Sequence, residues 1–164
     1  MTVVSDTGPL IALAKVGPLS VMARLFTEVL IPPGVHRELF AKSGPEVEHL
    51  EAALEHFMHV TPLDPMPPEV IIVTRRLDPG EQQAIALAYT RHALLIIDDR
   101  QGRVAARRLN VPVTGLVGVL VQAKRRGLCS EVLPLLQDVR QRGYWLSDGL
   151  LDVAARLAGE AEEG

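Results

Sequence analysis

The residues Thr2-Val3-Val4-Ser5-Asp6-Thr7-Gly8-Pro9 decide the fold, because they place a β-branched run directly before an acid and a helix start. Valine and threonine favour extended backbone, so the run predicts a strand over residues 2–5. The acid, the hydroxyl and the proline that follow suit a helix start, which predicts a helix over residues 10–16. In parallel α/β sheets, residues just beyond the carboxyl end of a strand line the ligand crevice, so Asp6 is a candidate site residue.

The rest of the chain repeats this alternation of short apolar runs and helical segments. Further strands are expected over residues 29–31, 94–97 and 111–113. Helices are expected over residues 19–26, 35–42, 45–56, 82–91, 100–109 and 115–126, and two amphipathic segments over 132–139 and 150–157. Residues 62–68 contain four prolines and predict a crossover loop. Apolar strands that alternate with helices indicate an α/β fold with a parallel sheet covered on both faces.

Length and composition favour one soluble globular domain over residues 1–164. The chain is 48% apolar and 23% charged, which argues against disorder. Charged residues interrupt every apolar run well short of a membrane span, and no basic segment precedes a long apolar stretch, so neither a transmembrane helix nor a secretory signal is expected. The single cysteine, Cys129, excludes an internal disulfide and a cysteine-built zinc site, and we expect a cytoplasmic location.

The charge is unevenly distributed, although the formal net charge is only −3. Residues 100–126 contain seven lysines and arginines and no acid. Arg100, Arg103 and Arg107 follow each other at spacings that place them on roughly one helical face. These three arginines are therefore candidate contacts to the phosphates of a nucleic acid.

Four or five separated acids are expected to meet at one edge of the sheet. Asp6 follows the first strand, and Asp98 and Asp99 follow the strand over residues 94–97. Glu81 starts a helix and precedes an inward apolar stripe, and Glu38 borders another apolar face. Carboxylates at short range repel unless a proton or a cation enters, and an all-oxygen ligand set suits Mg²⁺ or Mn²⁺. Such an ion polarises a phosphoryl oxygen and supplies an activated water.

Each of these residues also has a structural interpretation. Asp6 can serve only as a helix cap, and Asp78-Pro79-Gly80-Glu81 matches a capping box. Glu38 alone fits a half-exposed helical glutamate. Consecutive strand residues point to opposite sides, so only one of residues 98 and 99 can face a shared site directly, while the other caps the next helix. Thr114 can donate a hydroxyl to the site or cap its own helix.

Several stretches together resemble the PIN-domain superfamily, and most of all the small prokaryotic PIN proteins related to toxin ribonucleases of toxin–antitoxin pairs. The resemblance spans about residues 2–127 and rests on the stretches 3–11, 80–88, 95–100 and 113–115 in consistent order. It implies a three-layer α/β/α sandwich around a mainly parallel sheet. It also implies Mg²⁺- or Mn²⁺-dependent endonucleolytic cleavage of RNA, often single-stranded, by metal-activated water. Asp6, Glu38, Glu81 and either Asp98 or Asp99 match the family's acidic positions.

The resemblance leaves two departures. Many toxin relatives carry Asp where this chain has Glu81, and residues from about 128 to 164 form a helical extension beyond the minimal fold. The extension can pack a dimer, cover the groove or hold a partner. The resemblance further implies a toxin component, with a small antitoxin protein as partner, a homodimeric state and no membrane association.

The leading hypothesis is therefore a metal-dependent endoribonuclease with RNA as substrate. A non-catalytic nucleic-acid-binding or regulatory module on the same fold is the alternative, and its binding would persist in EDTA. A phosphoryl-transfer or receiver-type domain ranks last, because Asp6-Thr7-Gly8 lacks a second acid and the chain has no Gly-x-x-x-x-Gly-Lys loop.

Overall fold

A five-stranded parallel sheet forms the centre of the computed structural model, which describes residues 1–162. The strand order is β3-β2-β1-β4-β5, and every neighbouring pair is parallel. The strands are β1 (Thr2–Ser5), β2 (Glu28–Ile31), β3 (Met58–Val60), β4 (Leu94–Ile96) and β5 (Val113–Thr114). In the central strand, Val4 pairs with Leu30 on one side and Leu95 on the other. All strands therefore end at the same edge of the sheet.

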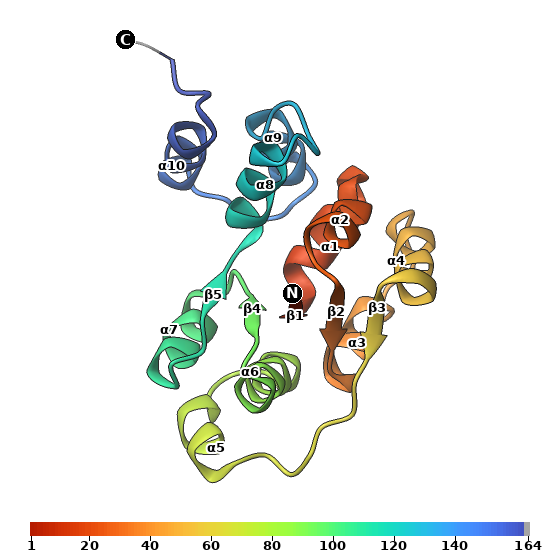
Figure 1. Ribbon diagram of the computed structural model, residues 1–164, viewed down its shortest axis with the longest axis vertical. Helices are drawn as coiled ribbons and strands as arrows, with labels where there is room; N and C mark the ends of the chain where they lie inside the picture. Colours follow the sequence, from red (N-terminus) through yellow and green to blue (C-terminus); the bar gives the residue numbers. More distant parts are fainter. Residues whose placement is uncertain (163–164) are drawn as a thin grey trace.

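Helices cover both faces of this sheet, as the sequence predicts, and give a three-layer α/β/α sandwich. One side carries α1 (Thr7–Val16), α2 (Val21–Leu25), α4 (Glu46–His56) and α8 (Leu116–Arg125), with a 3-10 turn at Pro18–Ser20 (Figure 1). The other side carries α5 (Pro68–Thr74), α6 (Pro79–Arg91) and α7 (Arg100–Arg108). Helix α3 (Pro33–Leu39) contacts both α1 and α6. Over residues 1–162, no helix combines the length and hydropathy that a bilayer crossing requires.

The apolar strands are buried because both faces of the sheet are covered. Val3, Val4, Leu95 and Ile96 are fully buried, as is Ile97 just beyond β4. Burial of side chains of this size stabilises the fold by roughly 1.5–3 kcal/mol each. This burial explains why uninterrupted apolar runs identify the central strands correctly.

Two elements depart from the predicted pattern. Strand β3 lies at the sheet edge, and two of its three residues are exposed, so it has no apolar run to mark it. The predicted crossover loop over residues 62–68 ends where α5 begins, because Pro68 occupies the first turn of that helix. Proline is tolerated there, since the first N–H groups of a helix have no partner within it. The prediction of a proline-rich crossover thus missed a helix start.

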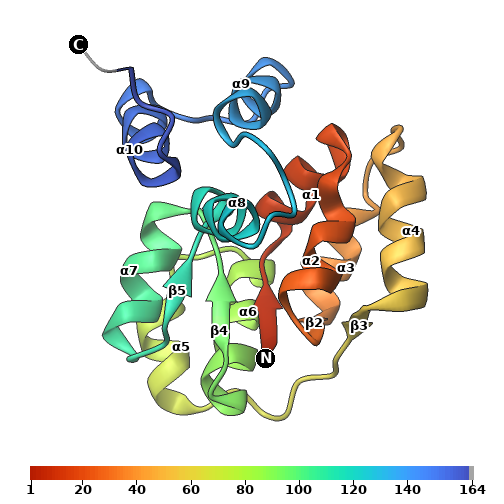
Figure 2. The same ribbon diagram turned by 45° about the horizontal axis from the view of Figure 1, so that its top comes forward.

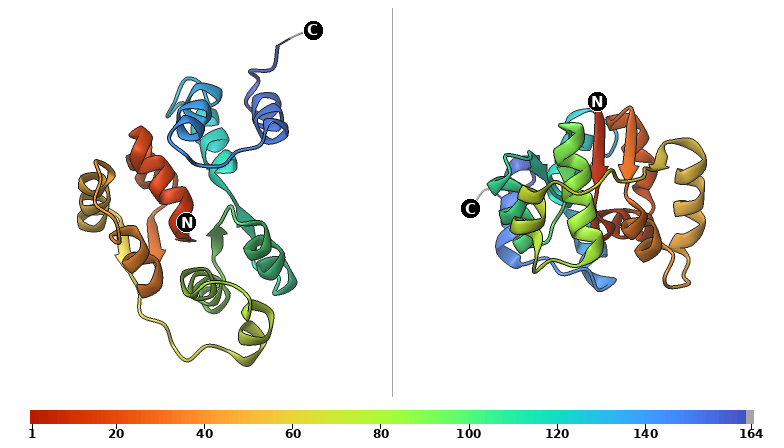
Figure 3. Two further views of the ribbon diagram at one scale, coloured as in Figure 1. Left: turned by 180° about the vertical axis from the view of Figure 1, so that it is seen from behind. Right: turned by 90° about the horizontal axis from the view of Figure 1, so that it is seen from below.

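The predicted extension forms two helices, α9 (Leu133–Gln141) and α10 (Asp148–Ala158), which pack outside the α1 and α8 layer (Figure 2). Seen from behind, they lie on the opposite side of the sheet from α5 and α6 (Figure 3). The Glu160 carboxylate fixes them, since it accepts hydrogen bonds from the backbone N–H groups of Val132 and Leu133 and pairs with Lys124 Nζ at 2.9 Å. Residues 163 and 164 of the predicted extension lie outside the described residues.

Candidate metal centre

Asp6 is a buried carboxylate at the carboxyl end of the central strand. Its backbone N–H donates to Ile96 O at 2.9 Å, which continues the pairing of β1 with β4 and fixes the residue at the sheet edge. The residue is only 7% exposed, and its side chain makes no cap hydrogen bond to α1. Its Oδ1 atom is buried without any hydrogen-bond partner. A buried carboxylate oxygen without a donor requires a proton or a cation nearby.

Asp6 faces a cavity of about 270 Å³ at this edge of the sheet. Six carboxylates from several elements line it, together with one threonine and one tyrosine hydroxyl. The carboxylates belong to Asp6, Glu38, Asp78, Glu81, Asp98 and Asp99, and the hydroxyls to Thr7 and Tyr144. Within the part of the chain that the structure describes, no lysine or arginine lines this cavity. Asp6, Glu38, Glu81 and the Asp98-Asp99 pair therefore all line one cavity at this edge of the sheet.

The carboxylates in this cavity act on one another electrostatically. Burial, together with the charges of Asp78, Glu38 and Asp99, raises the pKa of Asp6 to about 7. Burial also raises the pKa of Glu81 to about 7, with contributions from the charges of Asp78, Asp99 and Asp6. Each of these acids thus disfavours ionisation of its neighbours, which is the signature of a site that binds protons or cations.

Glu81 is held by the first turn of its own helix. Asp78 Oδ1 accepts a hydrogen bond from Glu81 N at 2.8 Å, and Glu81 Oε2 accepts one from Asp78 N at 3.3 Å. The predicted capping box is therefore confirmed. Capping and cavity lining coexist, because α6 begins at the edge where the strands end. Asp78 itself was predicted only as a cap, and its place in the cavity was missed.

Glu38 reaches the cavity through a bond to the residue after Asp6. Thr7 Oγ1 donates to Glu38 Oε2 at 2.5 Å. A Cβ atom at Gly80 would overlap the Glu38 carboxylate, so a larger residue there would displace this carboxylate. Glu38 is therefore fixed beside Asp6 and is no free surface glutamate.

The side chains of Asp98 and Asp99 accept hydrogen bonds from backbone N–H groups at the starts of two different helices. Asp99 Oδ2 accepts from Gly102 N at 2.7 Å and caps α7. Asp98 Oδ1 accepts from Leu116 N at 3.1 Å, at the start of α8. The charge of Asp99 acts on both Asp6 and Glu81, whereas that of Asp98 acts on neither. This repulsion favours Asp99 over Asp98 as the partner of Asp6 and Glu81.

Tyr144 is a site residue that the sequence reasoning missed. It comes from the extension, and its hydroxyl donates to Asp98 Oδ2 at 2.5 Å. Burial and the adjacent Asp98 raise the pKa of this phenol above its usual range, so it stays a donor. Its ring lies against Gly8, where a Cβ atom would come within 3.3 Å of the hydroxyl oxygen. Of the roles open to the extension, covering the cavity is the one that this contact supports.

The donor set fits a hard divalent cation in chemistry, although the side chains do not converge on one point. Over residues 1–162, no three His, Cys, Asp or Glu side chains are arranged to hold an ion. Carboxylate oxygens are nevertheless the ligands that Mg²⁺ and Mn²⁺ take, and the unpartnered Asp6 Oδ1 supplies one that no other group uses. Asp6, Glu81 and Asp99 are the residues that would hold such a cation.

The basic residues are arranged differently from the prediction. Arg100 lines a groove of about 590 Å³ between α5 and α7, together with Arg75, Arg76 and Arg108. Arg103 Nη1 instead donates to Ile97 O at 3.1 Å and serves the local structure, while Arg107 is exposed outside this groove. Arg100, Arg103 and Arg107 therefore have different surroundings, and their role as phosphate contacts stays a prediction.

Thr114 does not join the candidate metal centre. It lines another cavity, beside Met1 and Arg126, and the cap of α8 is Gly115 rather than Thr114. A Cβ atom at Gly118 would overlap the Thr114 hydroxyl oxygen, so this side chain lies against its neighbouring helix. Both predicted roles, a hydroxyl donated to the site and a side-chain cap, are absent from this arrangement.

A parallel α/β/α sandwich with clustered acids at the carboxyl edge defines a class of proteins that bind ligands beyond their strand ends. Comparison with known families gives the particular family: a PIN-domain family model matches residues 2–160, and the chain belongs to the PIN-domain family. A solved structure, a PilT N-terminus domain protein from the hyperthermophilic archaeon Sulfolobus solfataricus P2, is similar with a TM-score of 0.56 and 19% identity. The match covers 75% of this chain and 93% of that one. No curated protein is significantly similar to the chain.

Proposed function

We propose that this PIN-domain protein is a metal-dependent endoribonuclease that uses Mg²⁺ or Mn²⁺. The observation that carries the proposal is the buried Asp6 carboxylate, whose Oδ1 has no partner in a cavity lined by five further carboxylates. PIN domains are commonly nucleases that use divalent metal ions. When bound, such a cation neutralises the developing phosphoryl charge and lowers the pKa of an attacking water.

Different residues of the cavity would bind the cation and accept the proton of the attacking water. Asp6, Glu81 and Asp99 would bind it, because all three line the cavity and the charge of Asp99 acts on both of the others. Glu38 lies beside Asp6 and is fixed by the Thr7 hydroxyl, so it is placed to accept a proton from an attacking water.

RNA is the substrate that the neighbouring surface supports. The groove with four arginines between α5 and α7 begins at Arg100, which directly follows Asp99. A polyanion bound by these arginines would extend from the positively charged groove into the acid cavity, which lies close by. The cavity alone repels phosphates, so a cation and a flanking basic surface are both needed for a phosphodiester to enter.

The test is cleavage of a single-stranded RNA by the purified protein. We expect cleavage with Mg²⁺ or Mn²⁺, none with excess EDTA, and a loss of at least about 100-fold for Asp6→Asn. Asp64→Asn is a matched control, because Asp64 is an exposed aspartate in the loop between β3 and α5, outside the cavity. Equal activity of wild type and Asp6→Asn would refute the proposal and identify a contaminating nuclease.

One observation favours a second candidate, a non-catalytic nucleic-acid-binding module. Glu81, Asp98 and Asp99 all bond to backbone N–H groups at helix starts, as they would if they served only as caps. Such a module would bind RNA equally in EDTA and after Asp6→Asn, and it would cleave nothing. The toxin role, a small antitoxin partner, a homodimer and a cytoplasmic location stay predictions from the resemblance and the composition.

A further inference from the structure

The side chain of the single tryptophan of the chain is unusually exposed to solvent. Trp145 is 83% exposed and lies in the loop between α9 and α10. Tryptophan is highly buried on average, because its indole is the largest apolar side-chain group. An indole presented to solvent is typical of binding surfaces, where it provides contact area with few rotatable bonds.

The loop that carries Trp145 is anchored on both sides. On one side, the Tyr144 hydroxyl donates to Asp98 Oδ2, and Tyr144 N donates to Val139 O at 3.2 Å. On the other side, Leu146 is only 3% exposed. The backbone between two inward side chains is therefore fixed, and the indole is held outward by its neighbours.

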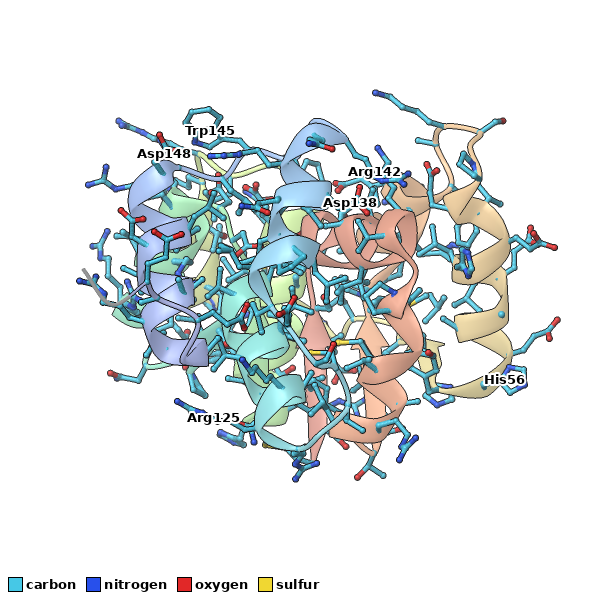
Figure 4. The ribbon with its side chains drawn as sticks, turned by 90° about the horizontal axis from the view of Figure 1, so that it is seen from above. His56, Arg125, Asp138, Arg142, Trp145 and Asp148 are labelled. Carbon is cyan, nitrogen blue, oxygen red and sulfur yellow. The ribbon has the colours of Figure 1, made fainter. Side chains whose placement is uncertain are left out.

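This indole lies at the edge of the molecule that carries the acids. Figure 4 places Trp145 at the edge opposite Arg125 and His56, which end α8 and α4. Helices in this fold run antiparallel to the strands, so that opposite edge is where the strands end. Tyr144 lines the acid cavity itself, and its Cα atom is one peptide unit, about 3.8 Å, from that of Trp145.

Two arginines at the end of α9 precede this loop, and each pairs with an aspartate. Arg140 Nη1 pairs with Asp148 Oδ1 at 2.6 Å, and Arg142 Nε pairs with Asp138 Oδ1 at 2.9 Å. Their side chains are 39% and 47% exposed, so part of each guanidinium faces solvent. An exposed aromatic at the rim of a phosphodiester site matches the way proteins bind single-stranded nucleic acid, by stacking of bases on its ring.

We propose that Trp145 is a stacking platform for an unpaired base of the RNA strand whose backbone enters the acid cavity. This inference rests on the proposed function and adds the residue that selects single strands, since a paired base offers no free face for stacking. Base stacking on an aromatic side chain depends little on sequence, so the platform selects strandedness and no particular base.

The first test uses the fluorescence of Trp145, which is the only tryptophan and so reports on this position alone. The wild-type protein with Mg²⁺ is titrated with a short oligoribonucleotide without self-complementarity, whose phosphorothioate linkages resist cleavage, and then with the same strand annealed to its complement. We expect saturable quenching by the single strand and little by the duplex. Equal quenching by the single strand and by the duplex, or no quenching by either, would overturn the proposal.

The second test compares substitutions by their dissociation constants for the same single strand. Trp145→Leu is expected to bind about tenfold more weakly, and Trp145→Phe to retain most of the affinity. Leu157→Ala is the matched control, since Leu157 is also exposed, at 51%, but lies at the far end of α10. Unchanged affinity of Trp145→Leu refutes the stacking role.

The outcomes separate this inference from the proposed function. If wild type cleaves RNA and Trp145→Leu has an unchanged KM, the platform is wrong and the nuclease stands. If the single strand quenches Trp145 while wild type cleaves nothing, the platform stands and the nuclease is wrong. If emission of the free protein is already blue-shifted and depends on protein concentration, a second copy covers Trp145 beside the exposed Leu150 and Val153, and the platform is wrong.

Discussion

Replacing Asp6 by asparagine should stabilise the metal-free protein at alkaline pH while it abolishes the proposed activity. The carboxylate is buried and its Oδ1 has no partner, so ionisation in the folded state is unfavourable. A carboxyl whose pKa rises from 3.8 to about 7 destabilises the fold by at most about 4 kcal/mol once it is fully ionised.

The sign of the pH dependence follows from the raised pKa. At a pH below 3.8, Asp6 is protonated in both states and the stability that its raised pKa contributes is fully present. As pH rises from 3.8 to about 7, the unfolded chain loses this proton more readily, so the free energy of unfolding falls. Above about 7 the loss is complete, and only a bound cation offsets it.

Urea unfolding measures this effect, since the midpoint reports stability when the slope is unchanged. In EDTA, the free energy of unfolding of Asp6→Asn minus that of wild type should grow by a few kcal/mol between about pH 5 and about pH 8. Added Mn²⁺ should then stabilise wild type at the higher pH and leave the variant unchanged. A difference between the two proteins that stays constant with pH would refute the reasoning.

Further predictions concern the other acids, the tyrosine and the extension. In a titration, Asp99→Asn should weaken Mn²⁺ binding about tenfold more than Asp98→Asn. Of these two residues, only Asp99 raises the pKa values of Asp6 and Glu81, and the reverse order of affinities would contradict this assignment. Tyr144→Phe should lower the free energy of unfolding by about 2 kcal/mol, because it removes a largely buried hydrogen bond to Asp98. Tyr89→Phe removes an exposed hydrogen bond to Glu69 and should change the free energy of unfolding little. Equal losses would show that the buried hydrogen bond does not stabilise the fold more than the exposed one. Glu160→Gln should lower the urea midpoint by removing charge-assisted bonds to the start of α9, and an unchanged midpoint would mean that this carboxylate does not fix the extension.

The sequence predicts the part of the site that depends on local patterns. Asp6 and Asp99 follow recognisable strands, and Glu81 starts a recognisable helix, so the parallel sheet brings them to one edge. Tyr144 could not be found in this way, since it is 46 residues from Asp98 and meets it only through the packing of α9 on α1. Strand β3 was missed for a physical reason as well, because an exposed edge strand of three residues leaves no apolar pattern.

Local patterns also leave the surroundings of each arginine undetermined. Helical spacing predicts which residues share a face, but it does not show which face packs against the sheet. Arg103 Nη1 donates to the carbonyl of Ile97, and Arg100 lines a groove completed by Arg75 and Arg76, which follow α5. Because α5 itself was hidden in a proline-rich stretch, the groove had no visible second wall.

Capping bonds at helix starts distinguish four of the cavity acids from Asp6. Asp78, Glu81, Asp98 and Asp99 each accept a hydrogen bond from a backbone N–H at a helix start, where the helix dipole also favours negative charge. Asp6 alone among the cavity acids leaves a buried oxygen without a donor. An asparagine at any of the four capping positions removes charge from both the fold and the site, so loss of activity there has two explanations. At Asp6 the two effects have opposite signs, and a variant that gains stability while it loses cleavage can only have lost function.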